Sequence, residues 1–374
     1  MNWSKGYSAA YYAKKVDPAT WQDLETINLT GGSIKRESSG LRQSADIDCV
    51  NYRIDIEQWV RIYLDTRQEG ASAHVPLFTG LATSPADDFN GNIKNNALEC
   101  YSVLKPADDM YLMRGWYAQA GRQGGDVIKQ LLEVISAPVV VTEESPRLDT
   151  AIIAEDSETR LTMVDKVLTA INWRLRIDGD GTVYVEPKPL EPVATFDPIE
   201  NDVIETAIKV TADWYSCPNV YMAIAEDLTG IARDDSPDSP LSTVNRGREV
   251  WMVDDNANLS DNESVAQYAQ RQLHDAQRIQ KTAEYDRRYM PEVGVGDIVR
   301  LRYPVQGLEG LFTVESQSVE LGYGARTSEQ VSTVVTPEEL KERPLEAKVV
   351  YLIDDSGAIF EDSGGDLNTA LTEV

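Results

Sequence analysis

Histidine and cysteine, the residues on which many metal sites and active sites depend, are scarce in this chain. The two histidines, His74 and His274, have no serine, cysteine or second histidine nearby in a pattern typical of a catalytic triad or a metal cluster. Both are therefore expected at the surface. The three cysteines, Cys49, Cys100 and Cys217, form no CxxC pair and no zinc spacing. Because Cys49 and Cys100 lie in apolar, strand-like surroundings, buried free thiols and assembly in a reducing cytoplasm are expected.

Long apolar runs are also missing. No run approaches the ~20 residues that a membrane-spanning helix needs. The N-terminal segment Met1–Ser8 has no apolar core of a signal peptide. The sequence therefore predicts no stable membrane insertion. If the protein reaches the outside of a cell, something other than an ordinary secretory signal must bring it there.

Positive charge is in deficit. The 374 residues include 35 Lys and Arg against 62 Asp and Glu, which gives a formal net charge of −27. Because phosphate affinity comes from Lys and Arg that displace counterions, tight binding to a nucleic acid backbone is not expected. Two interpretations of the acidity stay open. The acidic residues keep the protein soluble, or they form a wall that repels phosphate and lets a duplex slide past.

Two short motifs resemble ligand sites but fail on spacing or context. The segment Asp178–Gly181 begins like a calcium loop, which would need glycine at position 183 and glutamate at position 189, where the chain has Val183 and Pro189. A hairpin turn explains its glycines more simply. The segment Gly121–Gly125 leads into an expected helix and could meet phosphate, but it lacks the Gly-Lys-Ser/Thr ending of a P-loop.

Paired carboxylates could hydrolyse a glycosidic bond. Adjacent pairs such as Glu143 and Glu144 are nevertheless unavoidable among 62 acidic residues, so they indicate little. The sequence thus predicts no catalytic, cofactor or metal site, and it favours a structural protein over an enzyme.

Strand patterns dominate the two ends of the chain. Ala45–Val50 alternates apolar and polar residues as a half-buried strand should. Turns are expected at Gly31-Gly32 and at the hairpin signal Asn90-Gly91. Further strands are expected over Trp21–Leu29, Trp59–Leu64, Val75–Leu81, Ala97–Leu104, Trp173–Ile177, Thr182–Val185, Val203–Thr211, Val220–Ala225, Arg248–Val253, Val349–Ile353 and in the cluster Tyr285–Val335.

Helical spacing appears between the strand-rich stretches. Gly125–Ile135 is expected to be a helix that Pro138 stops, and Ser157–Leu168 a second helix with Ser157 as its N-cap. Asn262–Lys281 reads as a long, polar, amphipathic helix. Two loops are also predicted: a proline-rich linker over residues 187–198 and an exposed loop over residues 234–240.

One pattern occurs twice. Val60-Arg61-Ile62 followed by Leu77-Phe78-Thr79 is echoed by Val299-Arg300-Leu301 followed by Leu311-Phe312-Thr313. After each Leu-Phe-Thr the chain runs through polar, turn-rich sequence to another apolar strand. The shared order and spacing predict one barrel-like module that is present twice.

Several segments stand out by their order along residues 20–337. They are Leu24–Ile34, Phe78–Gly80, Asn172–Gly181, Pro291 with Gly296-Asp297, and Gly310–Val314. Their order and the surrounding pattern resemble the baseplate hub family of long-tailed bacteriophages, the trimeric proteins of the tail tip. That family includes the N-terminal hub region of tail-associated lysins.

The resemblance implies an α+β, β-dominated fold. Two similar antiparallel β-barrel domains and an interposed α/β portion would assemble as a trimeric ring. Residues 1–105 would form the first barrel, and residues 200–243 with 284–337 the second. Residues 106–199, completed by 244–283, would form the α/β portion. Residues 338–374 would form a C-terminal tail, whose repeated Asp-Ser-Gly motifs at 355–357 and 362–364 are either ordinary turns or part of a stem that docks a spike or fibre.

The implied function is structural. A homotrimer with pseudo-six-fold barrels would adapt the six-fold tail tube to a three-fold spike or fibre at the virion tail tip, and it would be assembled in the host cytoplasm. Its partners would be the tail tube or distal tail protein ring, the central spike or fibre protein and the tape measure protein. DNA would pass through its channel at ejection without specific binding.

Two alternatives belong to other classes. The chain ends at Val374, without the long enzymatic or fibre-like extension of many relatives, so lytic activity is expected on separate chains. A cell-wall-degrading tail enzyme stays as one alternative. A carbohydrate- or receptor-binding tail module is the other, favoured by 7 Trp and 17 Tyr.

Overall fold

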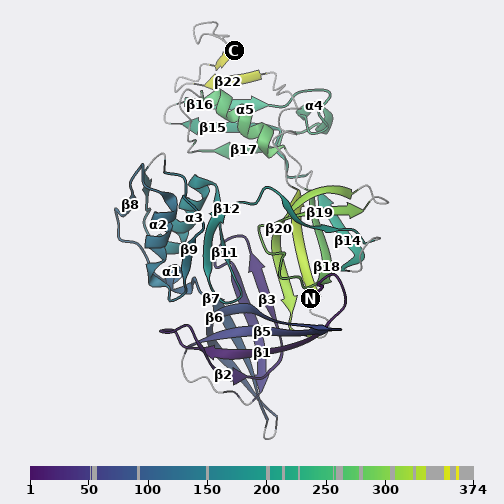
Figure 1. The fold of residues 1–374 in the computed structure, drawn as a ribbon. Helices are drawn as coiled ribbons and strands as arrows, with labels where there is room; N and C mark the ends of the chain where they lie inside the picture. The colour runs from purple at the N-terminus through teal and green to yellow at the C-terminus, as the bar shows by residue number, and fades with distance from the viewer. Residues whose placement is uncertain are drawn as a thin grey trace. The chain divides into compact units, whose positions relative to one another are not determined.

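The computed structural model shows a β-dominated α+β protein, as predicted (Figure 1). It describes residues 1–50, 52, 57–90, 93–148, 151–198, 203–212, 215–225, 228–255, 257, 264–277, 281–303, 308–322, 326–333, 349–353 and 359–361. The chain divides into two units. The first contains Met1–Lys209 with Ala283–Val334, and the second contains Val210–Thr282 with Val335–Val374.

A 13-stranded sheet forms most of the first unit. Its strands follow the order β14-β18-β21-β20-β3-β4-β7-β6-β5-β1-β2, and β19 joins β20 and β13 beside this path. The strands are β1 (Ser8–Val16), β2 (Asp23–Ile27), β3 (Leu29–Glu37), β4 (Gln43–Val50), β5 (Gln58–Gln68), β6 (Ala71–Asn90), β7 (Ile93–Ser102), β13 (Pro192–Phe196), β14 (Ile204–Ala212), β18 (Lys281–Arg288), β19 (Ile298–Tyr303), β20 (Leu308–Glu320) and β21 (Arg326–Thr333). We call β1–β7 the first module, and β13, β14 and β18–β21 the second module.

The two predicted barrels are not closed in the part of the chain that the structure describes. Instead, β3 of the first module pairs antiparallel with β20 of the second, with Arg36 opposite Gln317 and Ile34 opposite Val319. In a closed barrel, the edge strands of one module would pair with each other. Here β3 and β20 pair between the modules instead, so the strands form one open path.

The repeated sequence pattern forms the same structure in both modules. Val60 and Ile62 on β5 face the β6 segment with Phe78, and Val299 and Leu301 on β19 face the β20 segment with Phe312. All six side chains are buried. The pairing register differs by two residues, which leaves the same side chains on the inner face. These matching hairpins support the predicted duplication.

Three short helices and two small sheets form the α/β portion of the first unit. The elements are α1 (Lys105–Asp109), β8 (Tyr117–Ala118), α2 (Gly124–Leu131), the 3-10 turn η1 (Leu132–Val134), β9 (Val139–Val141), β10 (Ile152–Ile153), α3 (Arg160–Ile171), β11 (Trp173–Ile177) and β12 (Val183–Pro187). The predicted β11–β12 hairpin is confirmed, and β9 adds to it in parallel. Helix α2 contacts β9 and α3 contacts β11, which buries the apolar faces of both helices (Figure 1).

Two local predictions about glycine and proline were wrong. Gly31-Gly32 is no turn but lies inside β3, where the register shifts between Leu29 and Gly31. Gly32 has φ +139°, and an added Cβ would lie 2.3 Å from the carbonyl oxygen of Asp46, so glycine is needed for close strand approach. The proline-rich segment 187–198 is not only a linker, because it contains β13, which pairs in parallel with β19.

The second unit is a five-stranded sheet with one helix packed on it. It contains β15 (Val220–Ala225), β16 (Leu228–Arg233), α4 (Thr243–Arg246), β17 (Trp251–Asp254), α5 (Val265–Ala276), β22 (Val349–Ile353) and β23 (Ile359–Glu361), in the sheet order β17-β15-β16-β22-β23. The predicted amphipathic helix is present over α5. Its apolar residues Val265, Tyr268, Ala269 and Leu273 are buried against the sheet.

The loop over residues 234–240 is anchored rather than freely exposed. Asp234 is buried, and its carboxylate accepts hydrogen bonds from Ser239 and Gln277. Three sequence-based predictions fall outside the described residues: both Asp-Ser-Gly turn motifs of the tail and Gly91 of the Asn90-Gly91 turn. Among the helices that are described, none is long and apolar enough to cross a membrane.

Candidate functional site

The motifs that resembled ligand sites serve local structure. Asp178–Gly181 makes the β11–β12 turn, with the Gly181 amide donating to the Asp178 carbonyl at 2.9 Å and Gly181 at φ +88°. At the start of α2, the Gly124 amide donates to the Pro146 carbonyl at 2.9 Å and the Gly125 amide to the Ser145 hydroxyl at 2.7 Å. The chain's own oxygens thus occupy the amides that a phosphate would need.

The histidines and acidic pairs likewise form no reactive cluster in the described ranges. His74 is exposed, stacks on Tyr63 at 4.5 Å between ring centroids, and has Nδ1 2.6 Å from the carboxylate of Asp65. His274 is half-buried on α5. Glu144 accepts a hydrogen bond from Gln123 at 2.7 Å. Across the described residues, no group of three or more His, Cys, Asp and Glu could hold a metal ion.

The most distinctive surface is the outer face of the large sheet where the two modules join. Side chains alternate between the core and this face along strands such as β4, where Ala45 and Ile47 are buried and Asp46 and Asp48 are exposed. We define the acidic face as the outward residues of seven neighbouring strands. They are Glu205, Lys209, Glu284, Asp286, Arg326, Ser328, Gln330, Ser316, Ser318, Glu320, Ser33, Lys35, Glu37, Ser44, Asp46, Asp48, Glu99 and Tyr101.

Strand pairing holds these residues in rows that cross the seam, by which we mean the junction between β3 of the first module and β20 of the second. Ser318 on β20 lies opposite Ser328 on β21 and Lys35 on β3. Lys35 in turn lies opposite Ser44 on β4, and Ser44 opposite Tyr101 on β7. The face is therefore continuous from one module to the other, and its geometry depends on the β3–β20 pairing.

The cations of the acidic face are all engaged by acids of the same face. Lys209 lies 3.1 Å from Glu284, and Lys35 lies 3.7 Å from Asp46. Arg326 pairs with both Glu205 and Asp286. The hydrogen bond to the Asp286 carboxylate raises the pKa of the Arg326 guanidinium, so this cation stays charged. Each positive charge is thus neutralised locally.

Acidic residues remain in surplus. Glu37, Asp48, Glu99 and Glu320 are exposed, so their carboxylates face solvent. Glu99 accepts a hydrogen bond from Tyr101 at 3.1 Å, and this carboxylate raises the pKa of the Tyr101 phenol. Because screening in physiological salt acts over about 8 Å, the surplus repels phosphate only near the surface. A surface of this kind repels a nucleic acid backbone rather than binding it, because affinity for phosphate needs clustered Lys and Arg.

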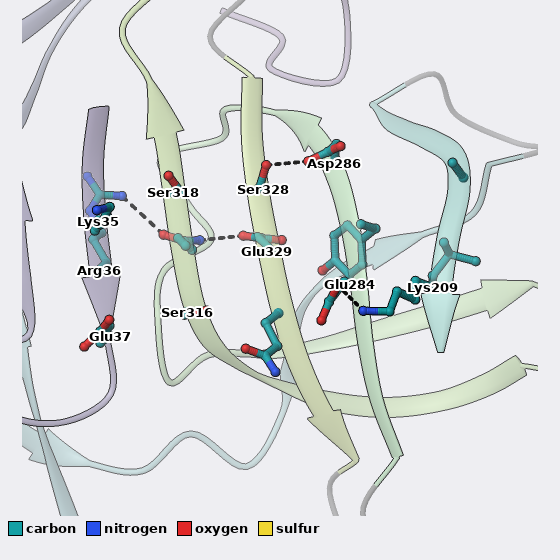
Figure 2. Close-up of a pocket in the computed structure, with 15 residues that line it drawn as sticks. Lys35, Arg36, Glu37, Lys209, Glu284, Asp286, Ser316, Ser318, Ser328 and Glu329 are labelled. Carbon is teal, nitrogen blue, oxygen red and sulfur yellow. Dashed lines mark hydrogen bonds and ion pairs between the residues drawn. The ribbon is translucent and has the colours of Figure 1, made fainter. Parts of the chain in front are cut away.

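An open depression of about 680 Å³ lies on the second-module side of the seam (Figure 2). It spans β14, β18, β21, β20 and β3, so both modules line it. Short side chains, Ser316, Ser318 and Ser328, come from the central strands, and longer charged residues such as Lys35 and Glu284 come from the flanking strands. The difference in side-chain length accounts for the hollow, and its lining includes no histidine or cysteine.

Sequence reasoning did not identify this face as a unit. Its signal was present as alternation within single strands, since Asp46 and Asp48 occupy the polar positions of Ala45–Val50. What the sequence lacked was the pairing that brings residues near position 40 beside residues near position 320.

Comparison with known proteins gives a fold but no sequence-level family. No protein-family model and no curated protein sequence matches the chain. A tail protein from Neisseria meningitidis MC58 matches over 88% of this chain and 97% of its own, with TM-score 0.62 and 16% identity. The 43 kDa tail protein of prophage MuSo2 from Shewanella oneidensis matches over 87% and 98%, with TM-score 0.60 and 12% identity.

A chain of the Francisella PdpA–VgrG complex is a third structural neighbour, with TM-score 0.56 and 8% identity. The match covers 91% of this chain but 60% of that chain. The expected resemblance to phage tail proteins is confirmed at the level of the fold.

Proposed function

We propose that this protein is a structural component of a bacteriophage tail, and specifically a homotrimeric hub at the tail tip. The observation that supports this most directly is the continuous sheet, which joins two similar modules and presents one acidic face. The likeness in fold to prophage tail proteins over nearly their whole length supports the same conclusion.

Three copies would place six similar modules around one axis, which matches a six-fold tube on one side and a three-fold spike or fibre on the other. The acidic face would line the central channel, so that ejected DNA meets a surface that does not retain it. In this arrangement β14, the terminal strand of the sheet as far as the structure describes it, would offer its outer backbone groups to a neighbouring copy.

The finer assignments belong to the same proposal. The first and second modules would be the two barrel-like halves of the hub, and residues 106–199 its α/β portion. The expected assignment of 200–243 to the second barrel and of 244–283 to the α/β portion is revised, because β15–β17 and α5 form a sheet and helix of their own in the second unit. The tail tube or distal tail ring, the spike or fibre and the tape measure protein would be partners, with residues 338–374 as a docking segment. The protein would be assembled in the host cytoplasm, would have no catalytic role and would stay at the virion tail tip.

Light scattering and negative-stain imaging of the purified chain test this proposal, alone and with rings of the tail-tube protein. We expect a three-fold ring with six lobes in at least the mixture. A chain that stays monomeric and never joins the tube rings would overturn the hub. Turnover of cell-wall material by the isolated chain would favour the enzyme alternative, and binding to intact host cells would favour the receptor-binding alternative.

A further inference from the structure

A hydrogen-bonded chain of polar side chains, half-buried at Arg36 and buried beyond it, crosses the seam between the two modules. Arg36 on β3 donates from Nη1 to Oε1 of Gln317 on β20 at 3.3 Å. Gln317 donates from Nε2 to the carbonyl of Val293 at 2.9 Å and to Oε1 of Glu329 at 2.5 Å. Glu329 accepts two further hydrogen bonds, from Nε and Nη2 of Arg287 at 2.8 and 2.5 Å. Figure 2 labels Arg36 and Glu329, and dashed lines run between them across β20, the strand that carries Gln317.

The first-module end of this chain is a single guanidinium. Arg36 also donates from Nη2 to the carbonyl of Leu77 on β6 at 2.7 Å. Its Cζ atom lies 5.7 Å from the ring centroid of Tyr289, in the second module's part of the sequence. Arg36 therefore contacts the backbone of one module and both a side-chain amide and an aromatic ring of the other.

Burial makes this chain sensitive to geometry. The side chains of Arg287 and Glu329 are both 0% exposed, and Gln317 is 2% exposed. In such surroundings a polar group that loses its partner is strongly destabilising, while the intact pair adds little net stability. A network of this kind discriminates between arrangements more than it stabilises any one of them.

The apolar contacts at the seam do not supply that discrimination. Ile34 lies opposite Val319, and Val319, Leu321 and Tyr289 pack into the core of the first module. Apolar burial is non-directional, so these side chains tolerate small slides and rotations. The hydrogen-bonded side chains add directional contacts to the β3–β20 backbone pairing, and together these hold one angle between the modules.

We propose that Arg36 and Gln317 are positioning residues that set the angle between the two modules, and thereby the curvature of the acidic face. The part of this inference that concerns the angle between the modules rests on hydrogen bonds within one copy of the protein. The consequence for a channel wall rests on the proposed function.

Spin–spin distance measurements on the full chain test the angle directly. Labels on cysteines introduced at Glu99 on β7 and Gln330 on β21 would lie roughly 23 Å apart, from four interstrand steps of about 4.8 Å and an offset of four residues of about 3.3 Å along the strands. The native cysteines are buried, and burial raises the pKa of the Cys100 thiol, so brief labelling selects the introduced sites. We expect a narrow distance distribution in the parent chain.

Two variants remove the link from opposite sides. Gln317→Leu deletes the central amide, and Arg36→Met deletes the first-module end while Gln317, Glu329 and Arg287 keep their bonds. Each variant is expected to broaden or shift the distribution of spin–spin distances, while an unchanged circular dichroism spectrum shows that the fold is kept. Val314→Ala is the matched control, because it removes buried volume from the second module but none of the hydrogen-bonded side chains. If Arg36→Met, the milder change, keeps the parent distribution, or if Val314→Ala broadens it equally, the inference is overturned.

Ring formation with the tube protein separates this inference from the proposed function. Broadened distances together with a parent chain that forms no ring would support the positioning role and reject the hub. A parent ring that persists with unchanged diameter in Arg36→Met, despite broadened distances, would overturn the role in curvature.

Discussion

Arg287 and Glu329 form an ion pair whose side chains are both fully buried. Glu329→Gln keeps the shape but leaves the Arg287 guanidinium without a counter-charge. We expect the free energy of unfolding to fall by about 3–5 kcal/mol, since an uncompensated buried charge is left behind. Denaturant unfolding followed by fluorescence measures the change. The double variant Arg287→Met with Glu329→Leu should lose much less, and an equal loss in both would contradict this explanation.

Gly32 is a second residue whose identity is dictated by its surroundings. A Cβ there would lie 2.3 Å from the Asp46 carbonyl oxygen and 2.9 Å from the Ile47 Cα, at a backbone φ of +139°. Gly32→Ala should therefore destabilise by at least about 1–3 kcal/mol, because β4 must move away. Gly310→Ala is the control, since its nearest neighbour would be the Phe312 ring at 3.6 Å. A thermal midpoint for Gly32→Ala as high as that of Gly310→Ala would argue against the close strand approach.

At the scale of elements, helix α3 begins later than its sequence suggested. Ser157 was the predicted N-cap, but it has φ +69°, and the cap is Thr159, whose hydroxyl accepts the Thr162 amide at 3.2 Å. Thr159→Ala should cost about 1 kcal/mol and speed amide hydrogen exchange in the first turn of α3. Ser157→Gly should be neutral or slightly stabilising, because glycine adopts positive φ without strain. Equal effects at the two positions would exclude Thr159 as the cap.

Elements with a local signal were predictable, and those that depend on distant partners were not. Alternation in Ala45–Val50 and the turn at Asp178–Gly181 specify β4 and the β11–β12 hairpin within a few residues. The strand β13 has no such signal, since its prolines suggested a linker and only parallel pairing with β19 makes it a strand. The β3–β20 pairing joins residues from 279 (Glu37 and Ser316) to 287 (Ser33 and Glu320) positions apart, and no local pattern encodes that contact.

The candidate site likewise combines features with a local sequence signal and features that depend on distant pairing. Each outward acid could be assigned from its strand's period of two, but the acidic face as a surface exists only because β3–β20 pairing aligns the strands of two modules. Since the sequence has no catalytic motif, its functional clues were the repeated module, the resemblance to the hub family and the charge imbalance. The fold then shows that part of the excess of acidic residues is concentrated on the acidic face.

At the scale of the whole molecule, the acidic face should determine how the protein responds to DNA. Replacing Glu37, Asp48, Glu99 and Glu320 by lysine places cations beside one another on one continuous surface. The parent chain should not retain a duplex at low salt, because phosphate affinity needs clustered Lys or Arg. The lysine variant should bind, with affinity that falls steeply as salt rises, by a slope near −0.9 per phosphate contacted. Fluorescence anisotropy of a labelled duplex measures both.

Four lysines placed elsewhere, at the exposed positions Glu69, Glu133, Glu143 and Glu191, give the same net charge without the clustering. If net charge alone decided DNA binding, the two variants would bind alike. If the geometry of the face decides it, the clustered variant binds more tightly and with the steeper salt dependence, because only neighbouring cations can displace counterions from the same stretch of duplex. The second outcome is expected, since strand pairing holds the four replaced positions on adjacent strands of one sheet.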